Sequence, residues 1–268
     1  EKSHRRWSRS IFSWPYATQT FCFCLFTYRR FILLKVVTEE LREKYHRPIR
    51  SFVLRTGRLT PSQQNAPDNY WNDYGIDFSE KLLDFDAIFG NDAPITLEIG
   101  FGNGESLLKQ AIDNPGRNFL GIEVHTPGVG LLIAGAQKAG ISNLRVMRYD
   151  AVEVLNHQIP ENSLDRVQLF FPDPWHKKRH NKRRILQDDF VDSIRQHLRI
   201  GGHFHMATDW ENYAEHMLKN MQQQVHFFNV AGEAHFVSPE GLRPETKFER
   251  RGLKLGHGVW DMVYERKD

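Results

Sequence analysis

Residues 97–104, LEIGFGNG, decide the fold, because they join an apolar segment to an amphipathic one through three closely spaced glycines. The apolar segment ITLEIG (95–100) predicts a strand, and ESLLKQAIDN (105–114) has apolar residues at helical spacing. Glycines allow a tight turn and let a ligand approach the backbone closely. The spacing is G-x-G-x-G and differs from the G-x-G-x-x-G of dinucleotide-binding folds. Taken alone, this loop could also be only a tight turn.

Strand and helix patterns alternate on the C-terminal side of this loop. We predict strands at 95–100, 118–124, 143–150, 164–171, 203–208, 225–231 and 258–265, and helices at 105–114, 128–139, 187–198 and 210–223. A long loop separates the last two strands. Alternation of this kind predicts an α/β fold, with a parallel sheet and helices on both faces.

Glycines or a carboxylate follow each of the first five predicted strands. They are the loop at 100–104, Glu123, Asp150, Asp173 and Asp209. In parallel sheets ligands bind outside the carboxyl ends of the strands, so these groups would line one crevice. Glu123 could accept hydrogen bonds from both hydroxyls of a ribose, and Asp150 could accept a hydrogen bond from the amino group of adenine. The alternative for Glu123 and Asp150 is simple capping of the helix that follows.

The stretch FPDPWHKKRHNKRR (171–184) follows the fourth predicted strand and carries six Lys or Arg in its last eight residues. The prolines would hold Asp173 in a fixed geometry, and the cations could bind phosphates beside it. Because Asp173 and the cations are neighbours in the chain, phosphate contacts made by the cations would set the position of a nucleic-acid base relative to Asp173. Three alternatives remain: Trp175 packs in the core, the run is a solvated face, or Asp173 is a turn residue.

The N-terminal residues do not follow these patterns. Residues 1–36 lack helical or strand periodicity, and their apolar run is too short to span a bilayer. We expect a non-native or disordered extension, translated in frame ahead of a natural start near Val37. A genuine poorly ordered extension and a membrane-associating segment are the alternatives. Residues 37–75 read as a basic arm followed by a polar loop with an aromatic cluster at 61–75, and 76–268 as the main domain.

Composition narrows the class of protein. The net charge is only +3, so positive charge is local rather than general. The two cysteines, Cys22 and Cys24, fit a reduced intracellular setting, and we predict a cytoplasmic protein with no membrane partner. The 13 histidines show no metal-ligand spacing, so we expect no metal. We also expect a monomer rather than a homodimer.

Five segments in this order resemble the bacterial tRNA (guanine-N7)-methyltransferase family, TrmB type. They are LEIGFGNGE, GIEV, FFPDPWHKKRHNKRR, TDWENYAEHM and TKFERRG, and the resemblance extends over residues 46–268. It implies a Rossmann-like class I methyltransferase fold with a mostly parallel seven-stranded sheet. It further implies S-adenosylmethionine as methyl donor, S-adenosylhomocysteine as product, and N7 of a guanosine at position 46 in the tRNA variable loop as acceptor.

The resemblance also assigns residues. Asp173 would be catalytic and would contact the cofactor region. Cofactor binding would involve Glu98, Gly100, Gly102, Glu123 and Asp150; substrate binding Lys177, Asp209, Thr246, Lys247, Phe248 and Glu249; and RNA binding Arg179, His180, Asn181, Lys182, Arg183 and Arg184.

The predicted chemistry suits these carboxylates. Guanine N7 carries an in-plane lone pair and no proton, so it can attack a sulfonium methyl without a general base. In-line placement of the two reacting atoms supplies the rate. Positive charge then develops on the guanine ring, and a nearby carboxylate such as Asp173 can stabilise it while accepting hydrogen bonds from N1–H and the 2-amino group.

Three other functions remain open at this point. An amino-methyltransferase would place Asp/Asn-Pro-Pro-aromatic after the fourth strand, whereas the order here is Pro172-Asp173-Pro174-Trp175. An NAD-dependent oxidoreductase would require G-x-G-x-x-G and no basic run. A non-catalytic RNA-binding module would explain the basic residues but not the aligned carboxylates.

Overall fold

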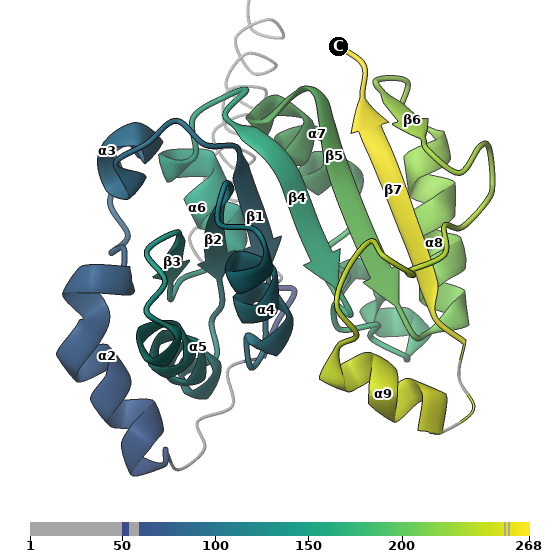
Figure 1. The fold of residues 1–268 in the computed structure, drawn as a ribbon. Helices are drawn as coiled ribbons and strands as arrows, with labels where there is room; N and C mark the ends of the chain where they lie inside the picture. The colour runs from purple at the N-terminus through teal and green to yellow at the C-terminus, as the bar shows by residue number, and fades with distance from the viewer. Residues whose placement is uncertain (1–49, 54–58, 255, 257) are drawn as a thin grey trace, which may run out of the picture. The chain divides into compact units, whose positions relative to one another are not determined.

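The computed structural model describes residues 50–53, 59–254, 256 and 258–268, which belong to one compact unit, Arg50–Asp268 (Figure 1). The expected extension at 1–36 and most of the basic arm at 37–60 lie outside the described residues. The proposed domain boundary at residue 76 remains a prediction.

A seven-stranded sheet forms the centre of the unit, in the order β3-β2-β1-β4-β5-β7-β6. The strands are β1 (Ile95–Ile99), β2 (Asn118–Ile122), β3 (Leu144–Met147), β4 (Leu164–Phe170), β5 (Leu198–Thr208), β6 (Phe227–Asn229) and β7 (Trp260–Arg266). Neighbours are parallel from β3 to β5, while β7 runs antiparallel to both β5 and β6. The predicted mostly parallel seven-stranded sheet is confirmed.

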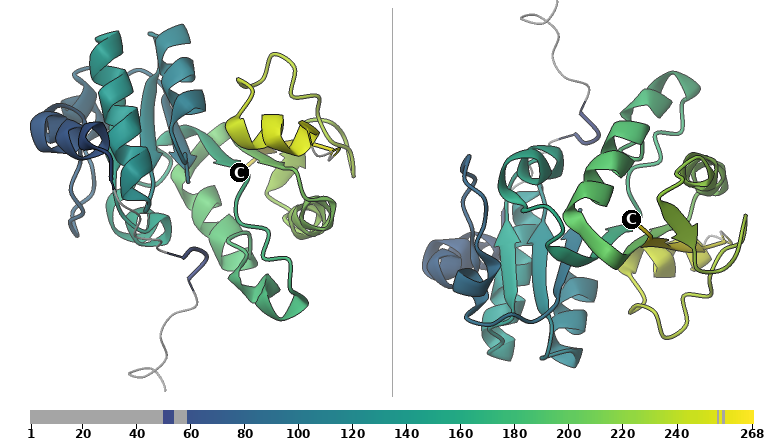
Figure 2. Two further views of the ribbon diagram at one scale, coloured as in Figure 1. Left: turned by 90° about the horizontal axis from the view of Figure 1, so that it is seen from below. Right: turned by 90° about the horizontal axis from the view of Figure 1, so that it is seen from above.

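Helices cover both faces of this sheet (Figure 2). They are α2 (Pro61–Tyr74), α3 (Phe85–Phe89), α4 (Glu105–Asp113), α5 (Thr126–Ala139), α6 (Ala151–Gln158), α7 (Asp188–His197), α8 (Glu211–Gln222) and α9 (Lys247–Lys254), with a 3-10 helix, η1, at Lys178–Arg183. In Figure 1, α4 and α5 lie in front of the sheet, α6 and α7 lie behind it, and α9 lies below the carboxyl ends of β4 and β5.

Burial explains why the central strands form. All five residues of β1 and of β2 are buried, as expected for parallel strands covered on both faces. Two apolar clusters result. One lies around β1, β4, β5 and the helices α6 to α8, and the other lies between β2, β3 and the helices α2, α4 and α5.

The segment 61–75 differs from its prediction, because it is the helix α2 and not a polar loop. Thr60 and Gln63 form a capping box: the Thr60 side chain accepts a hydrogen bond from Gln63 N–H, and Gln63 Oε1 accepts one from Thr60 N–H. Pro61 occupies the first turn, where its missing N–H costs nothing. The helix packs on α5 so closely that a Cβ on Gly130 would lie 2.1 Å from Gln63 O. Tertiary packing stabilises a helix whose hydrophobic periodicity is weak.

The helices α3, α6 and α9 and the 3-10 helix η1 were not predicted either. Residues 151–158 form α6, which Asp150 caps by accepting a hydrogen bond from Val152 N–H. The predicted loop before the last strand contains α9, so Lys247–Glu249 open a helix. Thr246 and Glu249 form its capping interaction, since Glu249 N–H donates to Thr246 Oγ1 at 3.1 Å.

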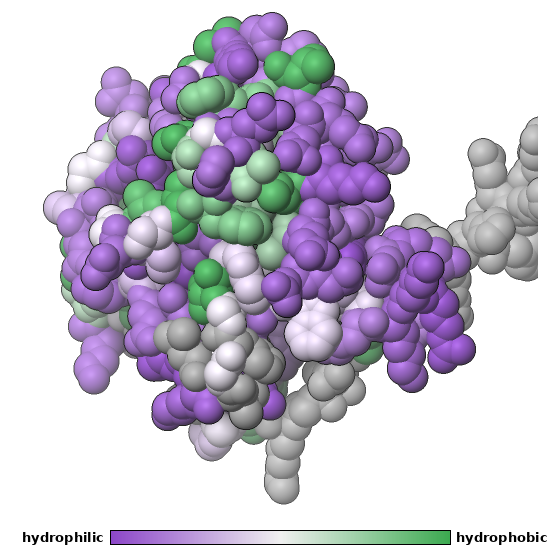
Figure 3. Space-filling view, turned by 90° about the vertical axis from the view of Figure 1, so that its right-hand side faces the viewer, coloured by the Kyte–Doolittle hydropathy of each residue, from purple (hydrophilic) through white to green (hydrophobic). Residues whose placement is uncertain are grey.

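The β6 edge of the sheet is shown in Figure 3, where apolar side chains gather among polar ones. The exposed apolar residues on and beside this strand include Val225, Phe228 and Val230, and Lys267 lies over the Phe228 ring. Within the described part of the chain, no helix is long and apolar enough to cross a membrane.

Candidate active site

A cavity of about 700 Å³ opens at the carboxyl ends of β1, β2 and β4. The chain leaves β1 toward β2 on one side and later returns as β4 on the other, so the cavity sits where the strand order reverses. Open α/β sheets bind ligands at this point. Of the predicted site residues, Gly100, Gly102, Glu123, Asp150, Asp173, Lys177 and His180 line the cavity.

The glycine loop adopts a backbone that other residues rarely reach. Gly100, Gly102 and Gly104 have φ values of 74°, 57° and 76°, which lie in the left-handed region that favours glycine. Gly100 N–H donates to Ile122 O at 2.8 Å and ties the loop to the end of β2. The loop is therefore held in a tight curve at the wall of the cavity.

Glu123 is held by three backbone donors. Its Oε2 accepts a hydrogen bond from Gly102 N–H at 2.8 Å, and its Oε1 accepts from Val124 and His125 N–H at 2.7 and 2.9 Å. These bonds fix the carboxylate at the cavity wall and join it to the glycine loop. They leave acceptor capacity for a hydroxyl, since a carboxylate has about four lone-pair sites.

Asp150 combines the two interpretations of its position. Its Oδ1 caps α6, as the alternative interpretation required, and the residue also lines the cavity. Burial raises the pKa of the Asp150 carboxyl, partly offset by the hydrogen bond from Val152 N–H. The cap leaves Oδ2 able to accept a hydrogen bond from a ligand.

Glu98 lies behind the cavity wall and does not line it. The residue is only 3% exposed, and Gln110 Nε2 lies 3.5 Å from its Oε2. Gln110 also exchanges two hydrogen bonds with Gln168, at 3.1 and 2.7 Å. Burial raises the pKa of Glu98 to about 8, against the opposing effect of Arg243. Any contact of Glu98 with a cofactor thus requires rearrangement or a mediating group.

The raised pKa predicts a pH dependence of stability. Between pH ~5 and ~8 the folded state keeps a proton on Glu98 that the unfolded chain releases, so the free energy of unfolding falls by roughly 1 kcal/mol per pH unit. The variant Glu98→Gln has no carboxyl group at this position and does not lose stability in this way. We therefore expect its free energy of unfolding to rise relative to that of the parent protein as the pH rises. Urea unfolding of the cofactor-free protein at pH 5.5 and 7.5 measures the difference. Parallel pH dependences in parent and variant would disprove the assignment, with exposed Glu211→Gln as control.

Asp173 lies between two residues with unusual backbone. Phe171 and Trp175 have φ values of 50° and 47°, in a region that is strained for aromatic residues. Such strain collects at functional sites, where the surrounding structure maintains it. Here Trp175 Nε1–H donates to Ser51 O at 3.1 Å, and the Arg183 guanidinium lies 4.9 Å from the Trp175 ring centre. Trp175 thus forms part of the cavity wall and connects it to the N-terminal arm at Ser51.

Arg184 is placed differently from its predicted role in RNA binding. It is 3% exposed, and its Nε donates to Pro174 O at 2.9 Å and its Nη2 to Asn212 Oδ1 at 2.8 Å. The guanidinium also lies 4.7 Å from the Tyr213 ring centre. Buried with these partners, Arg184 anchors the motif that carries Asp173, and we exclude it from the RNA-binding set.

The rest of the basic run differs in exposure. Lys177, Arg179 and Lys182 are exposed, whereas His180, Asn181 and Arg183 are half-buried against the motif. His180 packs edge-on against Trp175, and Asn181 O accepts a hydrogen bond from Arg184 N–H. The exposed cations are the ones available to phosphates.

Neutralising two of these cations should weaken tRNA binding through salt-dependent contacts. For Arg179→Gln combined with Lys182→Gln, we expect the slope of log K against log salt to fall by roughly 1 to 2, about one unit per lost phosphate contact. Binding titrations at several salt concentrations measure the slope. Lys138→Gln with Lys219→Gln removes the same charge elsewhere on the surface and should leave it unchanged. An equal change in both double variants would mean that only net charge matters.

The predicted substrate residues of the C-terminal half lie together, outside the cavity lining. Asp209 follows β5, and a Cβ on Gly252 of α9 would lie 3.1 Å from Asp209 Oδ2. Thr246 and Glu249 are buried at the start of the same helix. The side chains of Lys247 and Phe248 lie outside the description, so their predicted contacts stay predictions.

Three residues at the site were not predicted from the sequence. A Cβ on Gly128 of α5 would lie 1.9 Å from Gly102 O, so this glycine lets the helix approach the glycine loop. Tyr149 lines the cavity and stacks on Phe78, with ring centres 4.0 Å apart. Arg243 lies buried beside the rings of two cavity-lining phenylalanines. Only the glycine pattern of α5 could have suggested Gly128. Among the described residues, no cluster of His, Cys, Asp and Glu could hold a metal ion.

Comparison with known proteins identifies the class first. A solved structure of the 16S rRNA methyltransferase KamB shares the fold, with a TM-score of 0.53 at 16% identity over 70% of this chain and 95% of that one. Residues 92–262 match the family described as "Putative methyltransferase". The fold is that of a class I, Rossmann-like methyltransferase.

Closer relatives identify the family. Proteins named tRNA (guanine-N(7)-)-methyltransferase match from Vibrio cholerae, at 57% identity over 87% of this chain and 98% of theirs, and from Escherichia coli, at 59% over 82% and 92%. A protein of that name from Yersinia enterocolitica is 58% identical over 83% of this chain and 93% of its own. The chain belongs to the tRNA (guanine-N7)-methyltransferase family.

Proposed function

We infer that the protein transfers a methyl group from S-adenosylmethionine to N7 of a guanosine in tRNA. One observation carries this: a single cavity at the strand ends is lined by the glycine loop, Glu123 and Asp150 on one side and by Asp173 on the other. Exposed cations begin at Lys177, four residues after Asp173. Cofactor and acceptor can therefore meet beside groups that bind phosphate.

The residues of the cavity fit an adenosine-containing cofactor. The glycine loop leaves room for close approach of a ligand, and Glu123 can accept ribose hydroxyls while its backbone bonds hold it still. Asp150 can accept a hydrogen bond from an amino group through Oδ2, the oxygen that does not cap α6. When bound, S-adenosylmethionine supplies an activated methyl group and leaves as S-adenosylhomocysteine.

Asp173 would act on the guanine. Its carboxylate can accept hydrogen bonds from guanine N1–H and the 2-amino group, which orients N7 toward the methyl group. It can also stabilise the positive charge that spreads over the ring as N7 becomes methylated. The short rigid run between prolines keeps the carboxylate in one place, and Arg184 holds the second of these prolines through its carbonyl. No general base is needed for the transfer.

The finer assignments follow the family resemblance. We propose the variable loop, position 46, as the methylated site, Asp209, Thr246 and Glu249 as contacts to the substrate nucleoside, and a cytoplasmic monomer as the working form. Exposed Lys177, Arg179 and Lys182 would contact tRNA phosphates.

The deciding experiment is methyl transfer from labelled S-adenosylmethionine to unmodified tRNA, with nucleoside analysis of the product. We expect the label in 7-methylguanosine, and transcripts in which guanosine 46 is replaced by adenosine should accept none. Label on an exocyclic amine would assign an amino-methyltransferase instead. Binding of tRNA with no transfer would favour an RNA-binding module.

A further inference from the structure

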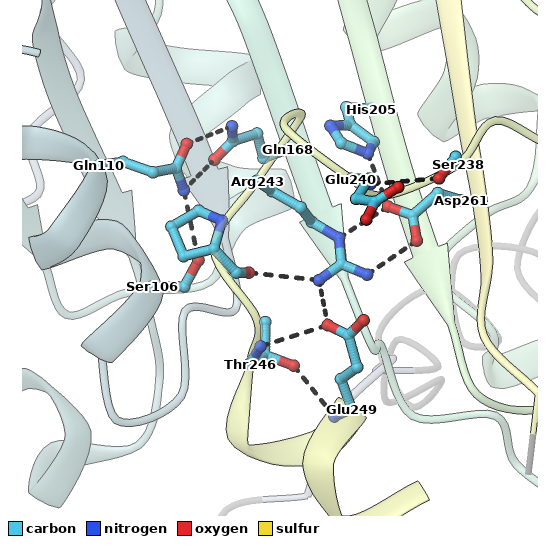
Figure 4. A network of polar contacts seen from close by, with 11 residues as sticks. Ser106, Gln110, Gln168, His205, Ser238, Glu240, Arg243, Thr246, Glu249 and Asp261 are labelled. Carbon is cyan, nitrogen blue, oxygen red and sulfur yellow. Dashed lines mark hydrogen bonds and ion pairs between the residues drawn. The ribbon is translucent and has the colours of Figure 1, made fainter. Parts of the chain in front are cut away.

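Arg243 is the centre of a buried polar network at the carboxyl edge of the sheet (Figure 4). Its side chain is fully buried. The guanidinium donates through Nε to Asp261 Oδ1 at 2.7 Å, through Nη2 to Asp261 Oδ2 at 2.8 Å, and through Nη1 to Glu249 Oε2. His205 Nε2 lies 2.8 Å from Asp261 Oδ1 and completes the network. One guanidinium thus joins two carboxylates from different elements.

The network connects the cavity to the proposed substrate segment. Asp261 is the second residue of β7 and lies opposite Ala207 of β5, and Glu249 lies in the first turn of α9. The guanidinium also lies 5.4 Å from the ring centres of both Phe170 and Phe171, which line the cavity. Arg243 is therefore in contact with the sheet, with the cavity wall and with the helix that Thr246 and Glu249 open.

The buried contacts of Arg243 contribute more to the orientation of its partners than to the stability of the fold. Burying a guanidinium with two carboxylates costs desolvation, and apolar replacements of such groups are often neutral or stabilising. What the rigid fork of an arginine provides is a fixed orientation of its partners. Burial opposes the charge of Arg243, yet its hydrogen bonds to Asp261 and Glu249 raise its pKa. The guanidinium is thus charged and held in one position.

The group that Arg243 orients on α9 is the carboxylate of Glu249. Its Oε2 accepts from Arg243 Nη1 and from Thr246 N–H, at 3.3 Å for the latter. Within the described part of the chain, Oε1 accepts no hydrogen bond. One oxygen is therefore fixed by the protein, while the other can accept a hydrogen bond from an N–H donor of a substrate base.

We propose that Arg243 is a positioning residue for methyl transfer. It acts through Glu249 and fixes the substrate segment at Thr246–Glu249 relative to the cavity wall formed by Phe170 and Phe171. This inference rests on the proposed function, because it assumes that Glu249 contacts the acceptor guanosine.

The test compares Arg243→Lys with the parent enzyme. Lysine keeps the charge but cannot bond to both carboxylates in the same geometry. We expect kcat to fall about 100-fold, as small misplacements of reacting groups do, with Kd for S-adenosylmethionine and for tRNA within about 3-fold of the parent values. An unchanged kcat would overturn the proposal. The parent enzyme is assayed first, so that failure of the proposed function appears there and not in the variant.

Arg266→Lys is the matched control. Arg266 is another buried arginine, at the last position of β7, and it donates to Asn162 Oδ1 at 2.6 Å, to Leu198 O and to Asp268 O. It lies away from the cavity lining. We expect a lowered Tm with kcat near the parent value. Equal losses of kcat at equal losses of Tm in both variants would reduce Arg243 to a structural role.

A double-mutant cycle shows whether Arg243 acts through Glu249. In the Glu249→Ala background, Arg243→Lys should cause no further fall in kcat, because the group it positions is gone. Multiplicative losses would overturn the proposal. Should Arg243→Lys fail to fold, Glu249→Ala alone leaves the Asp261 pair intact. It should then lower kcat while the protein still folds, and parent-like kcat in this variant would also overturn the proposal.

Discussion

Asp173→Ala should lower the methyl-transfer rate by roughly 10²–10³-fold while the protein stays folded. The carboxylate follows β4 at the cavity rim, between two prolines and two residues of strained backbone. Loss of its charge removes stabilisation of the positive guanine ring, and loss of its acceptors removes the orientation of N7. The side chain is exposed, so little packing is lost. Single-turnover kinetics with saturating cofactor and tRNA would measure the effect on the transfer step itself.

Two variants sharpen this experiment. Asp173→Asn keeps an acceptor but removes the charge, so an intermediate rate would separate orientation from charge stabilisation. Asp92→Ala truncates an exposed carboxylate in the loop just before β1 and should leave the rate unchanged. If Asp173→Ala turned over at the parent rate, the catalytic assignment would be wrong.

Gly128→Ala should weaken the binding of S-adenosylmethionine and destabilise the fold. A Cβ at this position would lie 1.9 Å from Gly102 O and 2.9 Å from Gly102 C, so either α5 or the glycine loop must move. In an unhindered helix, glycine to alanine gains about 1 kcal/mol, whereas we expect a net loss of roughly 2 kcal/mol here. Because Gly102 N–H holds Glu123, the shift would also displace the proposed ribose acceptor. Calorimetric titration with the cofactor should show an affinity at least ~10-fold weaker.

Gly135→Ala in the same helix is the matched control. Its Cβ would lie 2.5 Å from Leu108 Cδ2, the end of a flexible side chain that can rotate away. We expect cofactor affinity near the parent value, with a small change in stability of either sign. Equal loss of affinity in both variants would mean that α5 responds as a whole and that Gly128 has no special role at the loop.

The strand-end carboxylates could be predicted because parallel strands impose their own geometry. Once the chain alternates strand and helix, the residues after each strand must share one edge, and Gly102, Glu123, Asp150 and Asp173 do line one cavity. Glu98 shows the limit of that reasoning: it stands within β1 and its side chain is buried behind the wall. A strand pattern gives the edge but not which alternating side chain faces the ligand.

The basic run shows a similar limit. Six cations in eight residues indicate phosphate binding, but the sequence does not say which of them fold back. Arg184 is buried because Pro174 O, Asn212 and Tyr213 surround its guanidinium, and two of these partners come from a helix some 30 residues later. Long-range contacts of this kind leave no local pattern.

The sequence by itself determined the α/β class, because this class depends on the periodicity of apolar residues. It also determined which glycines and carboxylates follow each strand and the motif that carries Asp173, because these are residues adjacent in the chain. Only the tertiary structure decided that 61–74 is a helix, that Gly128 touches the glycine loop and that Arg243 joins β7 to α9. Each of these depends on contacts between segments far apart in sequence. Their energies come from packing and from buried hydrogen bonds, which appear only after the chain has folded.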